Sequence, residues 1–172
     1  MSEKSGREFI THEFDEAISI QKLVLETGKQ LSESHPEAES RRLIKSQVQA
    51  DERNLRELQR LGKPYGATGK VEDVAEALAS LARDTVKKAG EAPSEAYEAH
   101  AVLLLLRRKQ QDAAAAVLKI ARELKETSMR DSAREMLREG KKASQDLADS
   151  LASFAVSIAS RDAKPATSAK RG

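Results

Sequence analysis

Residues 129–160 read MRDSAREMLREGKKASQDLADSLASFAVSIAS. Small and apolar residues recur in this segment at intervals of three or four, and charged or hydroxyl residues fill most of the other positions. Such an interval places one side chain per turn on the same face of an α-helix. The residues of that face are Met129, Ala133, Met136, Gly140, Ala143, Leu147, Leu151, Phe154 and Ile158. The pattern predicts a long amphipathic helix that a capping box at Ser128 and Asp131 opens and that ends near Ser160.

The composition of the whole chain agrees with a helical protein. Ala, Glu, Leu, Lys and Arg make up 94 of the 172 residues, a bias typical of long helices, so we predict an all-α fold and exclude all-β and α/β folds. The chain has no Cys, which excludes thiolate catalysis, disulfides and Cys-ligated zinc. Aromatic residues make up 3% of the chain and Trp is absent, so platforms that stack bases or sugars cannot be built.

Four more helices are predicted before residue 129. A capping box at Ser5 and Glu8 opens the first, and a second box at Ser34 and Glu37, with Pro36 in the first turn, opens the next helix, which ends at Gly62. Residues 62–69 contain three glycines, but their spacing fits no phosphate-binding motif, so this segment is predicted to be a plain connection. A shorter helix over residues 71–89 follows, and a long one opens at Pro93 and runs to about residue 126.

These lengths predict a simple domain organisation. The first two helices are joined by a few residues, and so are the last two, which makes two antiparallel hairpins with the 71–89 helix in the crossover between them. Residues 1–160 are therefore predicted to form one helical bundle domain. Residues 161–172, rich in Ala, Lys, Pro and Ser, have nothing to pack and are predicted to be a disordered tail.

This connectivity resembles the ferritin-like four-helix-bundle superfamily, and so does the segment ADERNLRELQRLG at residues 50–62. The resemblance covers about residues 8 to 160. It implies a ferritin-like bundle with an extra helix in the crossover. It also implies a di-iron site, which in the family takes a Glu from each of two helices and a Glu-x-x-His motif from each of the other two.

The chain departs from the family at the residues that would bind iron. The residues three positions before the three histidines, His12, His35 and His100, are Phe9, Ser32 and Tyr97, so no Glu-x-x-His motif is present. Helical periodicity places Gln21, Asp51, Gln110 and Gly140 at the middle inward positions, with Asp51 and Asn54 where the second helix would hold its acid and histidine. One carboxylate among four positions is not a transition-metal site. We therefore expect no catalytic, cofactor-binding or metal-binding residues.

The sequence also supports predictions about the environment of several single residues. Asp51 lies on an inward stripe and must be paired or reach water. His100 is expected to be a hydrogen-bonded histidine at the core edge, and His12 and Glu16, four residues apart, are expected to support the first helix rather than bind a metal. Gly140 is predicted to let the apolar stretch of the fourth helix approach closely. The basic triplet 107–109 is expected to be a solvated face.

Charge and hydropathy give the remaining expectations. The net charge is +2 and the signs alternate, which argues against a nucleic-acid partner. No stretch is long and apolar enough to span a membrane, and residues 1–16 do not read as a secretory signal, so we expect a cytoplasmic protein. Residues 102–106 are apolar on every side of their helix, from which we expect a homodimer built partly on that helix.

The leading functional hypothesis is a non-enzymatic, metal-free ferritin-like bundle that serves as a scaffold or an oligomerising module with a possible protein partner. The alternative is an iron or manganese protein of the same superfamily with unorthodox ligands drawn from Asp51, Glu52, Glu95 and Glu98. A third possibility, reversible binding to a lipid surface through residues 150–160, ranks last because Phe154 is the only aromatic residue in that segment.

Overall fold

The computed structural model describes residues 6–71 and 73–162 of the chain. Five α-helices account for nearly all of this range: α1 (Gly6–Ser34), α2 (Ala38–Gly62), α3 (Asp73–Val86), α4 (Pro93–Glu123) and α5 (Thr127–Asp162). A short 3₁₀ turn, η1 (Lys63–Tyr65), follows α2, and the described residues contain no strand. The prediction of an all-helical protein is confirmed. Within these ranges, no helix has the length and apolar character needed to cross a membrane.

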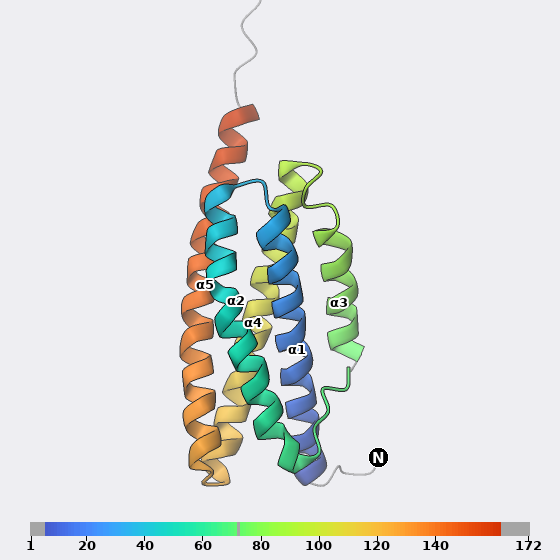
Figure 1. Ribbon diagram of the computed structural model, residues 1–172, viewed down its shortest axis with the longest axis vertical. Coiled ribbons are helices and arrows are strands. Elements are labelled where there is room, and N and C mark those ends of the chain that lie inside the picture. Colours follow the sequence, from blue (N-terminus) through green and yellow to red (C-terminus); the bar gives the residue numbers. More distant parts are fainter. Residues whose placement is uncertain (1–5, 72, 163–172) are drawn as a thin grey trace, which may run out of the picture.

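The four long helices form a bundle of two hairpins (Figure 1). Each hairpin packs its own two helices together, and the hairpins meet through α1 with α4 and through α2 with α5. Helices α1 and α5 run in one direction and α2 and α4 in the other. The crossover from α2 to α4 therefore returns along the bundle, and α3, which belongs to it, packs against α1 and α4.

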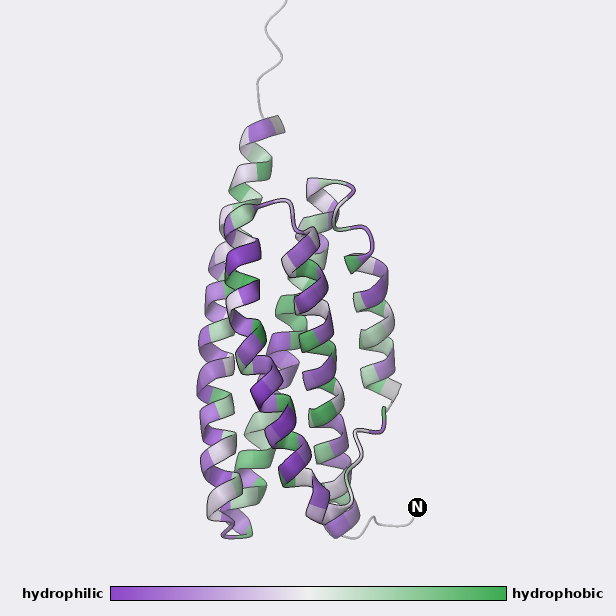
Figure 2. Ribbon diagram, viewed as in Figure 1, coloured by the Kyte–Doolittle hydropathy of each residue, from purple (hydrophilic) through white to green (hydrophobic). Residues whose placement is uncertain are grey.

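The interior of the bundle has two apolar clusters with polar residues between them. One cluster contains Ile20, Leu31, Ile44, Leu103 and Leu147 among others. The second contains Phe14, Leu58, Val117 and Met136 among others. In α2, α4 and α5 the members of the two clusters lie on opposite sides of a mainly polar stretch, whereas in α1 only Ser19 separates them. Figure 2 shows such a hydrophilic stretch near the middle of α4.

Helix α3 covers the apolar stretch of α4. Four of the five residues from Val102 to Leu106 are buried, and Leu105 alone is exposed, at 46%. Three residues of the crossover, Ala75, Ala82 and Val86, belong to the same apolar cluster as Val102 and Leu104. The stretch that seemed too apolar for one bundle is therefore largely covered within the chain, because the crossover helix adds a fifth packing face.

The turn between α1 and α2 differs from the predicted capping box. The Ser34 hydroxyl donates to the carbonyl of Gln30, and Pro36 lies before α2 rather than in its first turn. The Glu37 carboxylate instead accepts a hydrogen bond from Ser40. The turn is held by Arg41, whose Nη1 donates to the carbonyls of His35 (2.6 Å) and Pro36 (3.0 Å). The capping-box pattern did not reveal this arrangement, because Arg41, five residues after Pro36, is not part of the motif.

The junction of α4 and α5 also differs from prediction. Helix α4 ends at Glu123 and not near residue 126, because Lys125 adopts a left-handed conformation with φ 57°. The amide of Glu126 then donates to the carbonyl of Ala121, as in a Schellman motif. Helix α5 begins at Thr127, and its Ser128 hydroxyl accepts from Arg60 rather than capping the helix. A glycine usually marks such a helix end, and here the position is a lysine.

Two other predicted helix ends are corrected, and one is confirmed. Helix α3 ends at Val86 rather than at residue 89, because hydrogen bonds between residues three apart replace the helical ones from Lys88 onward. Helix α2 ends at Gly62 as predicted, but the left-handed glycines of the connection are Gly66, with φ 82°, and Gly69, with φ 75°. Helix α5 continues two residues past Ser160. The predicted start at Ser5 and the predicted tail from residue 163 onward lie outside the described residues.

Candidate functional site

An ion pair between α2 and α4 lies at the centre of the bundle. Arg107 and Asp51 are each 2% exposed. The Arg107 guanidinium faces the carboxylate with two nitrogens: Nη1 donates to Oδ1, and Nη2 donates to Oδ2 at 2.7 Å. Two parallel hydrogen bonds make this a bidentate, charge-assisted contact. Asp51 is therefore paired, as its inward position required, whereas the expectation of a solvated Arg107 is wrong.

Three glutamines surround this ion pair. Gln21 of α1 donates to the backbone carbonyl of Asp51 at 3.2 Å, and Gln110 of α4 donates to the Gln21 side-chain oxygen at 2.5 Å. Arg107 donates to Gln110 (3.3 Å) and to Gln47 (2.9 Å), and Gln47 donates in turn to the carbonyl of Ala143 in α5 at 3.3 Å. We call Gln21, Gln47, Asp51, Arg107 and Gln110 the polar layer. It connects all four long helices.

The predicted middle positions meet in or beside this polar layer. Gln21, Asp51 and Gln110 are members, and Gly140 lies against Gln110 and Gln111 on the α5 side. Arg107 and Gln47 were missed. Arg107 lies three residues before Gln110, so it shares the inward face, but its position in a basic triplet pointed to solvent. The placement of Asp51, which needed a partner, was the signal that could have found it.

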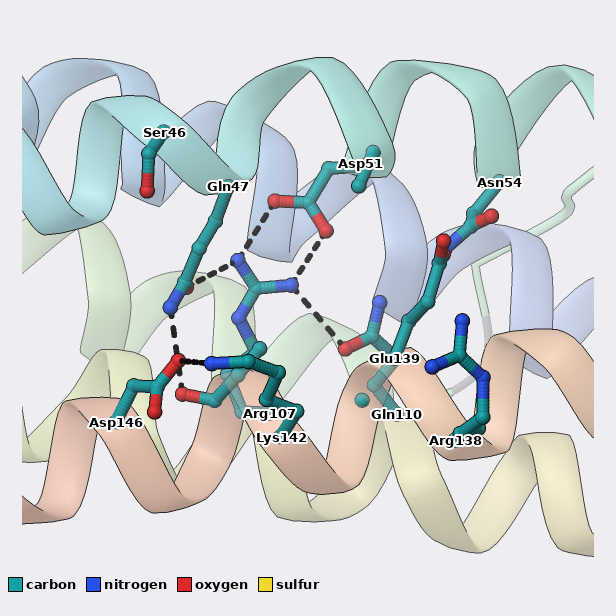
Figure 3. Close-up of a pocket in the computed structure, with 13 residues that line it drawn as sticks. Ser46, Gln47, Asp51, Asn54, Arg107, Gln110, Arg138, Glu139, Lys142 and Asp146 are labelled. Carbon is teal, nitrogen blue, oxygen red and sulfur yellow. Dashed lines mark hydrogen bonds and ion pairs between the residues drawn. The ribbon is translucent and has the colours of Figure 1, made fainter.

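A cavity of about 320 Å³ opens beside the polar layer between α2 and α5. Figure 3 shows Arg107 among Gln47 and Asp51 of α2 and Lys142 and Asp146 of α5. Arg53 of α2 forms an ion pair with Glu139 of α5 at 2.5 Å across the groove that holds the cavity, and Asn54 donates to the same carboxylate at 3.1 Å. Lys142 pairs with Asp146 along α5 at 2.5 Å. The lining residues of this cavity also include Ala50, Gly140 and Ala143.

The donor set of the polar layer does not suit a transition metal. A di-metal site in a helical bundle needs several carboxylates and imidazoles that converge, and the layer supplies one carboxylate, three amides and a guanidinium. Both oxygens of Asp51 already accept from Arg107. The one carboxylate of the layer is thus already neutralised by a cation of the chain itself.

The other ligands considered for a metal site lie apart from Asp51. Glu52 points away from the polar layer and pairs with Lys29 at 2.7 Å. Glu95 and Glu98 lie in the first turns of α4, nine or more residues before Arg107, which is on the order of 14 Å along a helix. These residues therefore do not form one site with Asp51.

One other group of possible metal ligands occurs within the described part of the chain. Ligand atoms of His12, Glu13 and Glu16 lie within 4.8 Å of one another in α1. The Glu16 carboxylate is engaged by Lys109 of α4, which closes an ion pair between the two helices. The expectation that His12 and Glu16 support the first helix stays a prediction.

Two buried histidines form a separate hydrogen-bonded chain near the α1–α2 turn. His35 and His100 are both 0% exposed, and the Nε2 atom of His35 lies 3.3 Å from Nδ1 of His100. The Glu37 amide donates to Nδ1 of His35, and Nε2 of His100 lies 3.1 Å from the Leu147 carbonyl. These neighbours assign the protons: each neutral ring carries its hydrogen on Nε2 and accepts at Nδ1. His100 is hydrogen-bonded as predicted.

Burial shifts the titration of both rings. Burial lowers the pKa of His35 to about 4, and the positive charge of nearby Arg41 adds to this effect. Burial also lowers the pKa of His100 to about 4, and the neighbouring His35 contributes in the same direction. Both histidines are therefore neutral at pH 7, as the direction of their hydrogen bonds requires.

The glycine-containing loop after α2 holds a carboxylate of its own chain. The Oδ1 atom of Asp15 in α1 accepts hydrogen bonds from the amides of Thr68 and Gly69, both at 2.7 Å. A group of converging amides of this kind binds anions in other proteins. Here the anion is internal, so the loop is a structural connection, as predicted from its spacing.

No protein-family model matches this sequence, and no curated protein matches it either.

Proposed function

We propose that this chain is a non-enzymatic, metal-free ferritin-like bundle that acts as a scaffold or interaction module. The observation that carries the proposal is the buried Arg107–Asp51 ion pair. In this interpretation the guanidinium supplies the positive charge at the level where the superfamily binds iron, and glutamines replace the remaining carboxylates. The protein keeps the bundle without the metal.

The arrangement of the helices supports this proposal. Two hairpins pack side by side with α2 and α4 running in the same direction, which a crossover along the length of the bundle requires (Figure 1). One long crossover between two hairpins is the connectivity of ferritin-like proteins. The three predicted polar middle positions, Gln21, Asp51 and Gln110, also lie at one level of the bundle.

The groups of the polar layer are suited to structure more than to catalysis. A general acid or base needs a titratable group that can reach a substrate, whereas both oxygens of Asp51 are bound by Arg107. Removal of one member of a buried ion pair leaves an uncompensated charge. The layer therefore fixes how the helices align along the bundle, because its hydrogen-bonding partners meet in one alignment only.

We extend the proposal to a homodimer that uses the outer face of α4. Leu105 is 46% exposed in the middle of this helix, and Val74 and Leu81 of α3 are also exposed. The apolar surface left for this dimer contact is smaller than the sequence indicated, because α3 covers the rest of the apolar stretch of α4.

Metal analysis tests the functional proposal. The full-length protein is purified, washed with a chelator and measured for iron, manganese and zinc by elemental mass spectrometry. We expect well under one metal ion per chain. One or more ions per chain, lost in Asp51→Asn but retained in the surface variant Asp131→Asn, would overturn the proposal and establish the metalloprotein alternative.

A further inference from the structure

One edge of the Arg107 guanidinium lacks a full set of acceptors. The end of the guanidinium consists of Nη1 and Nη2, and both of these atoms donate to Asp51. The side edge consists of Nη2 and Nε. On this edge Nη2 donates to the Gln47 amide oxygen at 2.9 Å, and the buried Nε has no hydrogen-bond partner among the described residues. One buried N–H donor of the polar layer is therefore left without an acceptor.

This unpaired donor is costly in a buried place. A buried polar group without a partner loses its hydration and gains nothing in return, and such groups are rare in folded proteins. Gln47 offers one neutral oxygen to an edge with two N–H groups. A carboxylate offers two oxygens at the spacing of the guanidinium fork, and both of its hydrogen bonds would be charge-assisted.

The cavity between α2 and α5 gives such a ligand a place to bind. Arg107 and Gln47 both line it, and its volume of about 320 Å³ corresponds to roughly ten water molecules. Three small residues, Ala50, Gly140 and Ala143, give part of its wall a surface against which a short alkyl chain can lie.

The charges around the cavity are balanced without a ligand. Asp51 neutralises Arg107, Glu139 accepts from Arg53, and Lys142 pairs with Asp146. Arg138, the remaining cation of the lining, is held by Glu135. The rim thus carries no net charge, and the attraction for a carboxylate comes from the two N–H groups on the side edge of Arg107.

We propose that this cavity binds a small aliphatic monocarboxylate, whose two oxygens accept from Nε and Nη2 of Arg107 in place of the Gln47 amide. Gln47 must move aside for this, because the Nε atom has no open surface while the amide covers the edge. Gln47 is thus a positioning residue that closes the empty site by bridging Arg107 and Ala143. The inference goes beyond the proposed function and does not depend on the metal content.

Butyrate is the probe, with butyramide as a neutral control of the same shape. The readout is the ¹⁵N–¹H resonance of Arg107 Nε in the full-length protein, because this group gains a hydrogen bond when the ligand binds. We expect a saturable shift with butyrate in the millimolar range, as befits a ligand of few atoms. Butyramide should give no saturable shift of this resonance.

Variants of two glutamines in α2 test the role of Gln47. Gln47→Ala removes the competing amide and should raise the butyrate affinity about fivefold, which corresponds to the loss of one hydrogen bond of about 1 kcal/mol. Gln49→Ala is the matched control, since Gln49 is exposed two residues away on the same helix, and it should leave the affinity unchanged. Gln47→Glu ties a carboxylate to the same edge and should abolish the butyrate response.

Three results would overturn the proposal. The first is the absence of a saturable shift with butyrate in the parent protein. The second is an equal shift with butyramide, which would show that the edge needs only an oxygen acceptor and not a carboxylate. The third is a butyrate response in Gln47→Glu as strong as in the parent. The parent titration decides the question by itself if Gln47→Ala fails to fold.

Discussion

At the scale of the residue, Gly140 leaves room for side chains of α4 at the level of the polar layer. A Cβ atom at this position would lie 3.2 Å from Cγ of Gln111 and 3.9 Å from Oε1 of Gln110. Gln111 is itself hydrogen-bonded to Ser144 and to the carbonyl of Arg107. The close approach predicted for Gly140 is thus present, but the facing residues are these glutamines and not the apolar stretch of α4.

The first prediction concerns substitutions of Gly140. Gly140→Leu should lower the free energy of unfolding by about 1–3 kcal/mol, because the side chain displaces Gln111 and its hydrogen bonds. Gly140→Ala should stay within about 0.5 kcal/mol of the parent, since a helix-propensity gain of up to ~1 kcal/mol offsets a small shift of Gln111. Urea melts of both variants measure this. A Gly140→Leu variant as stable as the parent would show that the space between Gly140 and Gln111 is large enough for a side chain.

The second prediction is a pH dependence of stability from His35 and His100. Both pKa values fall from 6.5 to about 4 in the folded chain, so the unfolded chain takes up protons first as the pH falls. Stability is full above pH 6.5 and is lost between about pH 6.5 and 4. The loss from pH 7 to 5 is on the order of 2 kcal/mol per histidine.

Urea melts at pH 7, 6 and 5 check this second prediction. The double variant His35→Gln, His100→Gln removes both titrating rings and should flatten the change over this range. A parent protein whose stability does not change from pH 7 to 5, or a double variant with the slope of the parent, would contradict the hydrogen-bonded chain of neutral rings.

Helical periodicity in the sequence showed which residues face the interior of the bundle, but it did not show which residues they contact there. Gln21, Asp51 and Gln110 follow from helical periodicity, and Asp51 had to be satisfied because it was the lone carboxylate among them. Arg107 is 56 residues away from Asp51 and His35 is 65 residues away from His100. Such partners are set by how helices align across the bundle, and no local pattern encodes that alignment.

At the scale of the element, the ends of the helices were harder to predict than their bodies. Apolar periodicity located every helix, whereas the capping boxes at Ser34 and Ser128 do not form. Ser34, Glu37 and Asp131 instead bond to residues within four positions of themselves, and only the Ser128 hydroxyl has a distant partner, Arg60. A capping motif therefore competes with every other polar group nearby, both along the helix and across the bundle.

The third prediction tests the left-handed end of α4. Lys125 has φ 57°, a conformation that costs a non-glycine residue about 1 kcal/mol. Lys125→Gly should therefore stabilise the protein by about 0.5–1 kcal/mol. Lys119→Gly, in the exposed interior of the same helix, is the control and should destabilise it by about 1 kcal/mol. Equal losses in both variants would show that the turn at Lys125 is not strained.

At the scale of the whole molecule, the fourth prediction concerns the homodimer. Light scattering at high micromolar concentration should give twice the mass of the chain. Leu105→Glu, which places a charge on the exposed middle of α4, should shift the protein to monomer. Leu124→Glu is the control, because Leu124 is exposed to nearly the same extent at 44% but lies after the end of α4. A monomeric parent would remove the dimer from the proposal.

The architecture of the molecule was predictable because composition and periodicity both indicate helices. The packing of α3 was harder to predict. Its apolar residues predicted a helix, but they did not predict that this helix would cover residues 102–106 of α4. A helix in a crossover can pack on either hairpin or on neither, and the choice depends on the surface that the other helices leave exposed.

The central claim is that Arg107 provides the cation around which the middle of the bundle is built. A double-mutant cycle of Arg107→Met and Asp51→Leu, followed by urea unfolding, tests it most directly. Each single variant should lose about 3–5 kcal/mol, because it leaves a buried charge unpaired. The double variant should lose far less than their sum, which gives a coupling energy of about 3 kcal/mol or more. Single effects that add to within about 0.5 kcal/mol would contradict the claim.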